Sequence, residues 1–289
     1  RIAFVNDLPF VKGHGTQNDF VLIPDANGRL DLTPDVVRRV CDRRAGIGGD
    51  GLIRVVRADA CADPAAIAAR EEFPGEMLWF MDYWNADGSL SEMCGNGIRV
   101  LARYLSDHAD VDTTAPLKIA TRAGIRTVEF TDAGITVDMG SPRLLSDTSV
   151  TLGDRSWPAR NVNMGNPHAV AFVDSLDQIG DLDQAPGHDE TLYPEGVNVE
   201  FVTRVGERHL AMRVHERGVG ETRSCGTGAC AVMVAAAIAD GAERGAPYVV
   251  DLPGGSLTIT WTEDDRILMT GPAVLVAEGI TSLLGSGPA

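Results

Sequence analysis

The chain has 289 residues, 44% of them hydrophobic and 23% charged, which is enough to bury a core in one large domain or two ordinary ones. Its formal net charge of −16 argues against a nucleic-acid-binding protein, which would carry a basic stripe, and against docking on anionic lipid. The N-terminal segment RIAFVNDLPF lacks the apolar run of a signal peptide and the longest apolar run (229–239) is too short to cross a bilayer, so we expect a cytoplasmic protein without membrane contact.

Short segments rich in β-branched residues and bounded by Gly, Asp or Asn predict strands along most of the chain. They cover residues 19–25, 50–56, 77–85, 118–130, 134–140, 168–174, 198–205, 209–218, 256–261 and 266–279. Three segments predict helices: 33–44, with Thr33 as N-cap and Pro34 at the first helical position, 95–108 and 226–241. Residues 152–161 and 181–195 are expected to form loops or short turns.

The segment AGIGGDG contains a G-x-G-x-x-G pattern at Gly46, Gly48 and Gly51. A dinucleotide site needs a strand before this pattern and a helix after it. Here a predicted helix precedes it and the predicted strand LIRVV follows. The pattern is therefore interpreted as a helix-to-strand loop.

Two segments of the chain resemble each other. CGNGIRVLARYL begins at Cys94 and CGTGACAVMVAA at Cys225, and each is preceded by a Gly and an Asn that lead into an apolar strand, at Asn18 and Asn166. This repetition predicts a duplicated α/β unit in which each half wraps a sheet around one apolar helix. The boundary is placed near Gly140, at a Gly-Ser-Pro turn.

Cys94 and Cys225 are the strongest functional candidates. One buried cysteine is usually a small hydrophobic residue, but two at matching helix N-termini favour chemistry. The partial positive charge and unpaired N–H groups of a helix N-terminus should lower the pKa of a thiol and can hold a carboxylate. Two such thiols on opposite sides of one carbon would suit the inversion of a stereocentre. Cys41, Cys61 and Cys230 lack this setting and are interpreted as structural.

Charged and amide residues surround these two motifs. Before Cys225 the sequence ERGVGETR is either a solvated loop or a site in which Arg217 clamps a carboxylate and Glu216 accepts from an ammonium group. His168 is either structural or a partner that shares the proton of a thiol. Asparagines in turns usually adopt left-handed or Asx-turn geometry, but their amides also suit an amino-acid ligand: Asn85, Asn96, Asn166 and Asn198.

The segments NADGSLSEMCGNGIR and ERGVGETRSCGTGACA, with GHGTQNDFV, MGNPHAV and GVNVEFV, closely resemble diaminopimelate epimerase. The resemblance extends from Lys12 to Pro272. It implies an enzyme without cofactor or metal that interconverts LL- and meso-2,6-diaminopimelate, on the route to lysine and peptidoglycan. It also implies a homodimer of chains with two pseudo-symmetric α/β domains, each a mixed, mostly antiparallel sheet around a central helix. The domains would be 1–140 with 272–289, whose last strand returns to the first, and 141–271, with the active site in the cleft between them.

The resemblance also implies roles for single residues. Cys94 and Cys225 would be the acid–base pair, and His168 and Glu216 would tune their proton affinity. Gly95 with Asn96, and Gly226 with Thr227, would present the helix N-termini to the reacting carboxylate. The rest of the substrate would be read by Asn18, Asn85, Asn166, Asn198, Glu216 and Arg217, with Arg217 on the distal carboxylate. Some family members have Gln where this chain has Gly51, and RIAFVNDLP extends beyond the usual start of the family.

Three alternatives remain open at the level of sequence. Proline or hydroxyproline racemisation uses a similar fold, but CGNG differs from the CGHG associated with proline racemases, and ERGVGE suits a substrate with a second charged end. A thiol–disulfide sensor would join Cys94 to Cys225 on oxidation and so inactivate the enzyme reversibly. A non-catalytic binding module would have no need of both thiols.

Overall fold

The computed structural model describes residues 7–283, and these divide into two compact units. The first unit contains the described parts of residues 1–137 and 272–289, and the second contains residues 138–271. The start of the N-terminal extension, residues 1–6, lies outside the described part. Leu8 and Pro9, the last residues of this extension, begin the first strand. No helix within residues 7–283 is long and apolar enough to cross a membrane.

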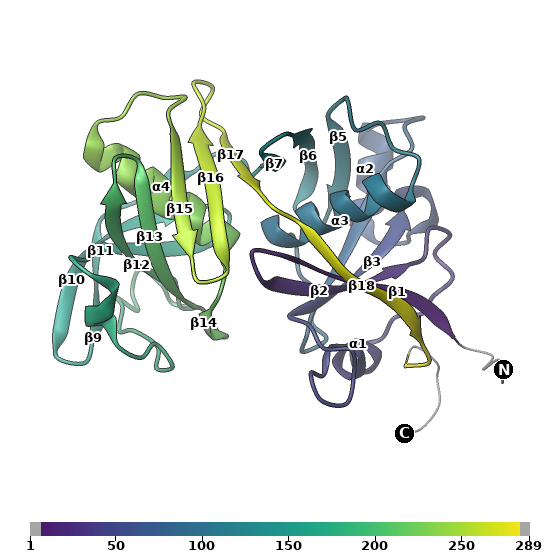
Figure 1. The fold of residues 1–289 in the computed structure, drawn as a ribbon, viewed down its shortest axis with the longest axis horizontal. Helices are drawn as coiled ribbons and strands as arrows, with labels where there is room; N and C mark the ends of the chain where they lie inside the picture. Colours follow the sequence, from purple (N-terminus) through teal and green to yellow (C-terminus); the bar gives the residue numbers. More distant parts are fainter. Residues whose placement is uncertain (1–6, 284–289) are drawn as a thin grey trace. The chain divides into compact units, whose positions relative to one another are not determined.

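The sheet of the first unit has the strand order β18-β1-β2-β3-β4-β5-β6-β7. Figure 1 shows β18 beside β1. The pairings of this sheet are antiparallel except β2–β3 and β4–β5, which are parallel. The strands are β1 (Leu8–Gly15), β2 (Asn18–Pro24), β3 (Gly51–Arg57), β4 (Trp79–Asn85), β5 (Leu117–Thr121), β6 (Gly124–Thr131), β7 (Gly134–Asp138) and β18 (Val274–Thr281). The end of the chain thus pairs with its beginning.

Helices cover both faces of this sheet. The central helix α3 (Gly95–His108) contacts β1, β2, β3 and β18 and buries Ile98, Leu101 and Leu105. On the other face, α1 (Pro34–Cys41) packs on apolar side chains of β2 and β3, and α2 (Pro64–Glu72) on those of β3 to β5. Because successive side chains of a strand point to opposite faces, burial on both faces explains why these strands are almost continuously apolar.

The second unit repeats this pattern with strand order β9-β10-β11-β12-β13-β15-β16-β17. Only β11–β12 and β13–β15 are parallel. The strands are β9 (Thr148–Leu152), β10 (Arg155–Asn163), β11 (Pro167–Phe172), β12 (Asn198–Gly206), β13 (His209–Glu216), β15 (Pro247–Leu252), β16 (Gly255–Trp261) and β17 (Ile267–Gly271). Two short strands, β8 (Arg143–Leu144) and β14 (Gly220–Thr222), pair with β10 and β13.

The helix α4 (Gly226–Asp240) is buried over most of its length and contacts β10 to β13 and β15 to β17. The opposite face of the sheet packs Ala169, Val199 and Phe201 against residues of the loop 176–197, including η2 (Leu176–Ile179). The predicted two-unit α/β fold, with a mixed sheet around one apolar helix in each unit, is therefore confirmed.

The strand register makes the two units equivalent residue by residue. Phe20 pairs with Gly51 in the first unit, and His168 pairs with Asn198 in the second, each two residues after an asparagine that begins or precedes the strand. Leu52 pairs with Trp84 in the first unit, and Val199 pairs with His215 in the second. Asn85, which follows Trp84, is therefore equivalent in position to Glu216, which follows His215. The repetition seen around the two cysteines thus extends through the sheet.

Some predicted elements are wrong. Residues 152–161 are not a loop, because β10 begins at Arg155 and pairs with both β9 and β11. Segments 118–130 and 266–279 are not single strands, because each is divided at a turn. The helix α2 and the strands β1, β9 and β15 were not predicted, although Asp63 before Pro64 is a regular helix start. The loop at 181–195 and the three predicted helices are confirmed, and Gly46–Gly51 does connect α1 to β3.

Candidate active site

Cys94 is the N-cap of α3. Its backbone is extended, and its Sγ accepts a hydrogen bond from the N–H of Gly97 at 3.5 Å. A thiol therefore takes the position where Ser, Thr or Asp usually satisfies a free N–H of the first turn. A Cβ at Gly97 would lie 2.8 Å from Met81 Cε and 3.2 Å from Ile53 Cδ1, so the helix starts in contact with side chains of the sheet.

Two asparagines are held beside the Cys94 thiol. Asn18 donates through Nδ2 to Asp50 at 2.8 Å, which leaves Oδ1 to accept from Cys94 Sγ at 3.4 Å and from Asn96 Nδ2 at 3.2 Å. The fully buried Arg99 donates to Asn96 Oδ1 at 2.8 Å and so fixes the orientation of that amide. The structure thus brings together three residues that the sequence predicted for this half of the site: Asn18, Cys94 and Asn96.

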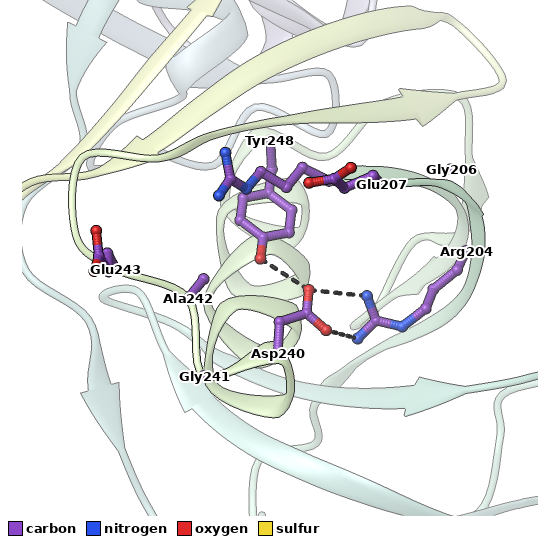
Figure 2. Close-up of a pocket in the computed structure, with 9 residues that line it drawn as sticks. Arg204, Gly206, Glu207, Asp240, Gly241, Ala242, Glu243 and Tyr248 are labelled. Atoms are coloured by element: carbon purple, nitrogen blue, oxygen red, sulfur yellow. Dashed lines mark hydrogen bonds and ion pairs between the residues drawn. The ribbon is translucent and has the colours of Figure 1, made fainter.

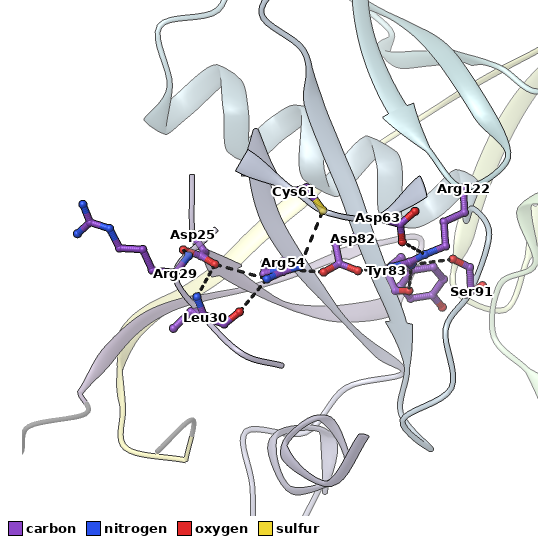
Figure 3. A network of polar contacts seen from close by, with 10 residues as sticks. All are labelled: Asp25, Arg29, Leu30, Arg54, Cys61, Asp63, Asp82, Tyr83, Ser91 and Arg122. Atoms are coloured by element: carbon purple, nitrogen blue, oxygen red, sulfur yellow. Dashed lines mark hydrogen bonds and ion pairs between the residues drawn. The ribbon is translucent and has the colours of Figure 1, made fainter. Parts of the chain in front are cut away.

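The loop that leads to Cys94 is anchored by Arg122 (Figure 3). This side chain donates to the carbonyl oxygens of Tyr83 at 2.8 Å and Ser91 at 3.2 Å. It is held in turn by Asp63 at 2.8 Å and by the buried Asp82. A guanidinium with several donors in one plane can tie a strand end and a loop together in this way. Asn85, at the end of β4, donates to Ser89 in the turn that precedes this loop.

Cys225 is the N-cap of α4 and repeats the geometry of Cys94. Its Sγ accepts from the N–H of Gly228 at 3.3 Å and lies 3.6 Å from Thr227 Oγ1. A Cβ at Gly228 would lie 2.8 Å from Glu200 Oε1 and 3.2 Å from Cys225 Sγ. The glycines of both motifs therefore allow the helix N-terminus to approach the polar side chains of its own sheet.

The expected lowering of the thiol pKa is wrong for Cys225. Burial raises the pKa of this thiol well above its usual range, and the negative charges of Glu216 and Glu200 raise it further. The hydrogen bonds with Thr227 and the Gly228 N–H act in the opposite direction but are weaker. Desolvation of the charged form thus outweighs the favourable field of the helix N-terminus.

His168 lies between two polar side chains on the face of the sheet that contacts α4. Its Nε2 is 3.0 Å from Asn166 Oδ1, and its Nδ1 is 2.6 Å from Glu200 Oε1. Asn166 in turn donates Nδ2–H to Thr227 Oγ1 at 3.3 Å. His168 therefore reaches the Cys225 thiol through Asn166 and Thr227. Glu200 was not predicted, although a charged residue among the apolar residues of β12 is unusual and marks it.

Three further predicted residues lie where β12 begins and the antiparallel β13 ends: Asn198, Glu216 and Arg217. Asn198 donates to the carbonyl of Pro167 at 3.0 Å and accepts from the Arg217 N–H at 2.9 Å. Glu216 accepts from Thr222 Oγ1 at 2.5 Å. The Arg217 side chain is 39% exposed and lies 4.0 Å from a carboxylate oxygen of Glu195. Its guanidinium is therefore accessible to an anionic ligand.

Gly51, the first residue of β3, offers no side chain to a ligand. A Cβ at this position would lie 2.6 Å from Trp84 O and 2.6 Å from Tyr83 Cε2. A larger residue would thus require the β3–β4 pair to move. In the register of the repeat, Gly51 takes the position of Asn198, so the first unit lacks this amide.

A surface hollow of about 550 Å³ lies at the other end of α4 (Figure 2). Asp240, the last residue of the helix, accepts there from Tyr248 at 2.8 Å and pairs with Arg204. A helix of 15 residues is about 22 Å long at 1.5 Å per residue. The hollow is therefore remote from Cys225, and two of its charged side chains, Arg204 and Asp240, are paired with each other.

Sequence comparison finds relatives along nearly the whole chain. The sequence model of the family described as diaminopimelate epimerase matches residues 10–145 and 160–276. A diaminopimelate epimerase of Streptomyces coelicolor is 58% identical over 280 residues, covering 94% of both chains. Those of Thermobifida fusca and Corynebacterium glutamicum are 46% and 43% identical, and each match covers 94% of this chain and 97% of the relative.

Comparison with solved structures identifies the same fold at low sequence identity. A PhzF-family protein of Bacillus anthracis superposes with a TM-score of 0.69 at 17% identity, covering 95% of this chain and 99% of that one. A hydroxyproline epimerase of Agrobacterium vitis, solved with trans-4-hydroxy-L-proline, has a TM-score of 0.64 at 13% identity and covers 96% and 93%.

Proposed function

The chain belongs to the diaminopimelate epimerase family, and we propose that Cys94 and Cys225 are the two acid–base groups with which it inverts the α-carbon of its substrate. The enzyme is an isomerase that interconverts LL- and meso-diaminopimelate, in the biosynthesis of lysine. The observation that supports the thiol pair is its repetition: each cysteine is a helix N-cap, and each sulfur accepts an N–H of the first helical turn.

Inversion needs a base on one face of the α-carbon and an acid on the other. In the proposed reaction the thiolate of one cysteine takes the α-proton, and its electron pair forms the new S–H bond. The electrons of the broken C–H bond pass into the α-carboxylate, which gains enolate character. The second thiol then gives its proton to the opposite face and becomes the thiolate, so that turnover in the other direction can start from this state.

The α-carboxylate is proposed to bind at the starts of the two helices. The N–H groups of Gly95 with Asn96, and of Gly226 with Thr227, belong to the first turns, where helical partners are lacking. Such groups stabilise negative charge where it develops in the transition state. Burial raises the pKa of Cys225, which favours its thiol form, and this form donates the proton in one of the two directions of turnover.

The remaining polar residues are proposed to recognise the rest of the substrate, which ends in a second amino-acid group. Arg217 has an exposed guanidinium and suits the distal carboxylate. Glu216 and the amides can accept from the distal ammonium: Asn18, Asn85, Asn166 and Asn198. His168 and Glu216 are proposed to tune the thiols, since the carboxylate of Glu216 raises the pKa of Cys225.

We also propose a cytoplasmic homodimer. Val274, Val276 and Ile280 are exposed on one face of β18. Three exposed apolar side chains on one strand face, which also carries Glu278, suit contact with a second copy of the chain. A disulfide between Cys94 and Cys225 is proposed to form on oxidation and to inactivate the enzyme reversibly. The disulfide would be detected as a loss of two mass units together with a loss of activity. Dithiothreitol should restore both the mass and the activity.

The decisive experiment uses LL-diaminopimelate in deuterated water under reducing conditions. The wild-type enzyme should place deuterium at the inverted α-carbon and produce the meso isomer. Cys94→Ala and Cys225→Ala should each reduce turnover at least about 1,000-fold, since inversion needs both groups. Cys230→Ala, in the same helix as Cys225, should retain kcat. Normal turnover by either active-site variant would refute the thiol pair.

A further inference from the structure

A continuous series of polar contacts joins the Cys225 sulfur to a buried carboxylate. Thr227 Oγ1 lies 3.6 Å from Cys225 Sγ and accepts from Asn166 Nδ2 at 3.3 Å. Asn166 Oδ1 is 3.0 Å from His168 Nε2, and His168 Nδ1 is 2.6 Å from Glu200 Oε1. We name these five residues the Glu200 relay. His168 lies on β11, Glu200 on β12 and Thr227 in the first turn of α4, while Asn166 and Cys225 directly precede β11 and α4; all are within the second unit.

The hydrogen bonds of the Glu200 relay have a defined direction. Because Asn166 donates Nδ2–H to Thr227, it presents its carbonyl oxygen to His168, whose Nε2 must therefore carry a hydrogen. Because Thr227 accepts from Asn166, its own hydroxyl hydrogen is available to Cys225 Sγ. Each member then donates toward the sulfur, which is the arrangement that stabilises a thiolate.

Glu200 determines this direction through the other ring nitrogen of His168. With Nε2 protonated, one more proton is shared between Nδ1 and Glu200 Oε1 across 2.6 Å. If that proton left the pair, Nδ1–H would face the carboxylate and Nε2 would become an acceptor. Asn166 would then have to donate to His168, and Thr227 to Asn166, which would leave the sulfur to donate as a thiol.

The surroundings of Glu200 favour retention of the shared proton. The side chain is fully buried, and burial raises the pKa of its carboxyl group, while His168 acts in the opposite direction. Glu216 on β13 raises the same pKa further. Within residues 7–283, its second oxygen, Oε2, has no hydrogen-bond partner.

The first unit has no counterpart of this relay. In the register of the repeat, Phe20 takes the position of His168 and Ile53 that of Glu200. Both are fully buried, and both would contact a Cβ placed on Gly97, as Glu200 would contact one on Gly228. In the first unit, apolar residues therefore pack against the start of the central helix. The buried ionisable pair His168 and Glu200 takes the place of these apolar residues in the other unit.

We infer that Glu200 is a positioning residue for the Cys225 half of the reaction, acting through His168, Asn166 and Thr227 to direct a hydroxyl hydrogen at the sulfur. This inference rests on the proposed function only for its catalytic consequence, since the hydrogen-bond direction does not require turnover. It predicts that the influence of Glu200 on Cys225 passes through the hydroxyl of Thr227.

A double-mutant cycle with Glu200→Leu and Thr227→Val tests this dependence. The first readout is the titration of Cys225 and Cys94, followed by NMR of 13Cβ-labelled cysteine without substrate. Glu200→Leu should move the Cys225 titration to higher pH, because the sulfur loses the hydroxyl hydrogen directed at it, and at least half of that displacement should disappear in the Thr227→Val background. A move to lower pH, as loss of the Glu200 charge alone would produce, would overturn the inference. The Cys94 titration in the same samples should not change. Additive displacements, or an equal change at Cys94, would overturn the inference.

The second readout is kcat in both directions. Glu200→Leu should lower kcat about tenfold in the wild-type background, the scale of a weakened acid–base group, and less than about threefold beside Thr227→Val. Glu200→Gln can still form a hydrogen bond with His168 Nδ1, so its kcat should lie between those of Glu200→Leu and wild type. If Glu200→Leu does not fold, Glu200→Gln takes its place in the cycle. Asp240→Asn removes a paired carboxylate at the far end of α4 and should change neither readout. Equal kcat for Glu200→Leu and wild type would refute the role.

If the titration cycle shows coupling but neither the wild-type protein nor any variant epimerises diaminopimelate, the relay is supported and the proposed function is refuted. If turnover is normal and the cycle is additive, the proposed function stands and the relay fails.

Discussion

His168 occupies in the second unit the position that Phe20 occupies in the first. Each lies two residues beyond an asparagine that contacts the start of the central helix, and each pairs with the first residue of the neighbouring parallel strand. The backbone has been repeated, but the side chains differ in charge. The two cysteines therefore share a helix position without sharing an electrostatic environment.

Removal of the Glu216 charge should lower the pKa of Cys225. After burial, this carboxylate is the largest influence that raises the thiol pKa. In Glu216→Gln the thiolate should thus form at lower pH, and the titration of 13Cβ-labelled Cys225 should move to lower pH than in wild type. Glu221→Gln, on the adjacent strand and paired with Arg213, provides the control. A Cys225 titration that is unchanged or moves upward contradicts this expectation.

Arg122 should matter for catalysis beyond its effect on stability. Arg122→Met frees the Ser91 carbonyl in the loop before Cys94 and removes one partner of the buried Asp82. Breaking a buried ion pair costs about 3 kcal/mol, and we expect kcat to fall at least about tenfold as the loop loses its anchor.

Arg54→Met is the matched control, because it removes the other guanidinium of Asp82, at 2.7 Å, without touching Ser91 (Figure 3). It should lower the free energy of unfolding by a similar amount, measured by urea denaturation, while kcat stays within about threefold of wild type. If both variants lose kcat equally, Arg122 has only a structural role.

Cys41 should make the protein less stable as the pH rises. Burial raises the pKa of this thiol from 9.0 to about 12 in the folded state. Above pH 9 the unfolded chain releases the proton and the folded chain retains it, so stability that is complete below pH 9 falls as the pH approaches 12, by up to about 1.4 kcal/mol per pH unit.

Cys41→Ala removes this ionisation. The variant should be less stable than wild type at pH 7, because a buried sulfur is lost, but the difference should shrink between pH 9 and 11. Urea denaturation across this range measures it. Parallel stability curves for the two proteins would contradict the prediction.

Val276→Glu should separate the proposed dimer. This residue is 60% exposed on β18 and lies between Val274 and Glu278 on the same face. A charge buried in an interface without a partner costs several kcal/mol, so analytical ultracentrifugation should show a monomer where wild type shows a dimer. Val219→Glu, at an exposed residue of the second unit, should leave the assembly unchanged. A wild-type monomer at micromolar concentration would refute this interface.

The sequence by itself determined the repeated unit, the two helices that begin at Cys94 and Cys225, and the family. Local sequence signals were sufficient for these features. In both units, Cys-Gly-x-Gly before an apolar run marks the start of a helix. The sequence did not reveal β1, β9, β10 and β15, because their segments mix polar, Gly or Pro residues with few apolar ones. The regular alternation of β1 and β15 appears only in their burial.

Only the tertiary structure decided the chemistry around each thiol. Strand register places Glu200 against His168, which is 32 residues away in sequence, and packing removes water from Cys225. The helix N-terminus alone suggested a thiol of low pKa, a prediction that desolvation and two carboxylates reverse. Burial depends on every neighbour that surrounds a group, and those neighbours are set by the fold of the whole unit, which a local sequence motif does not contain.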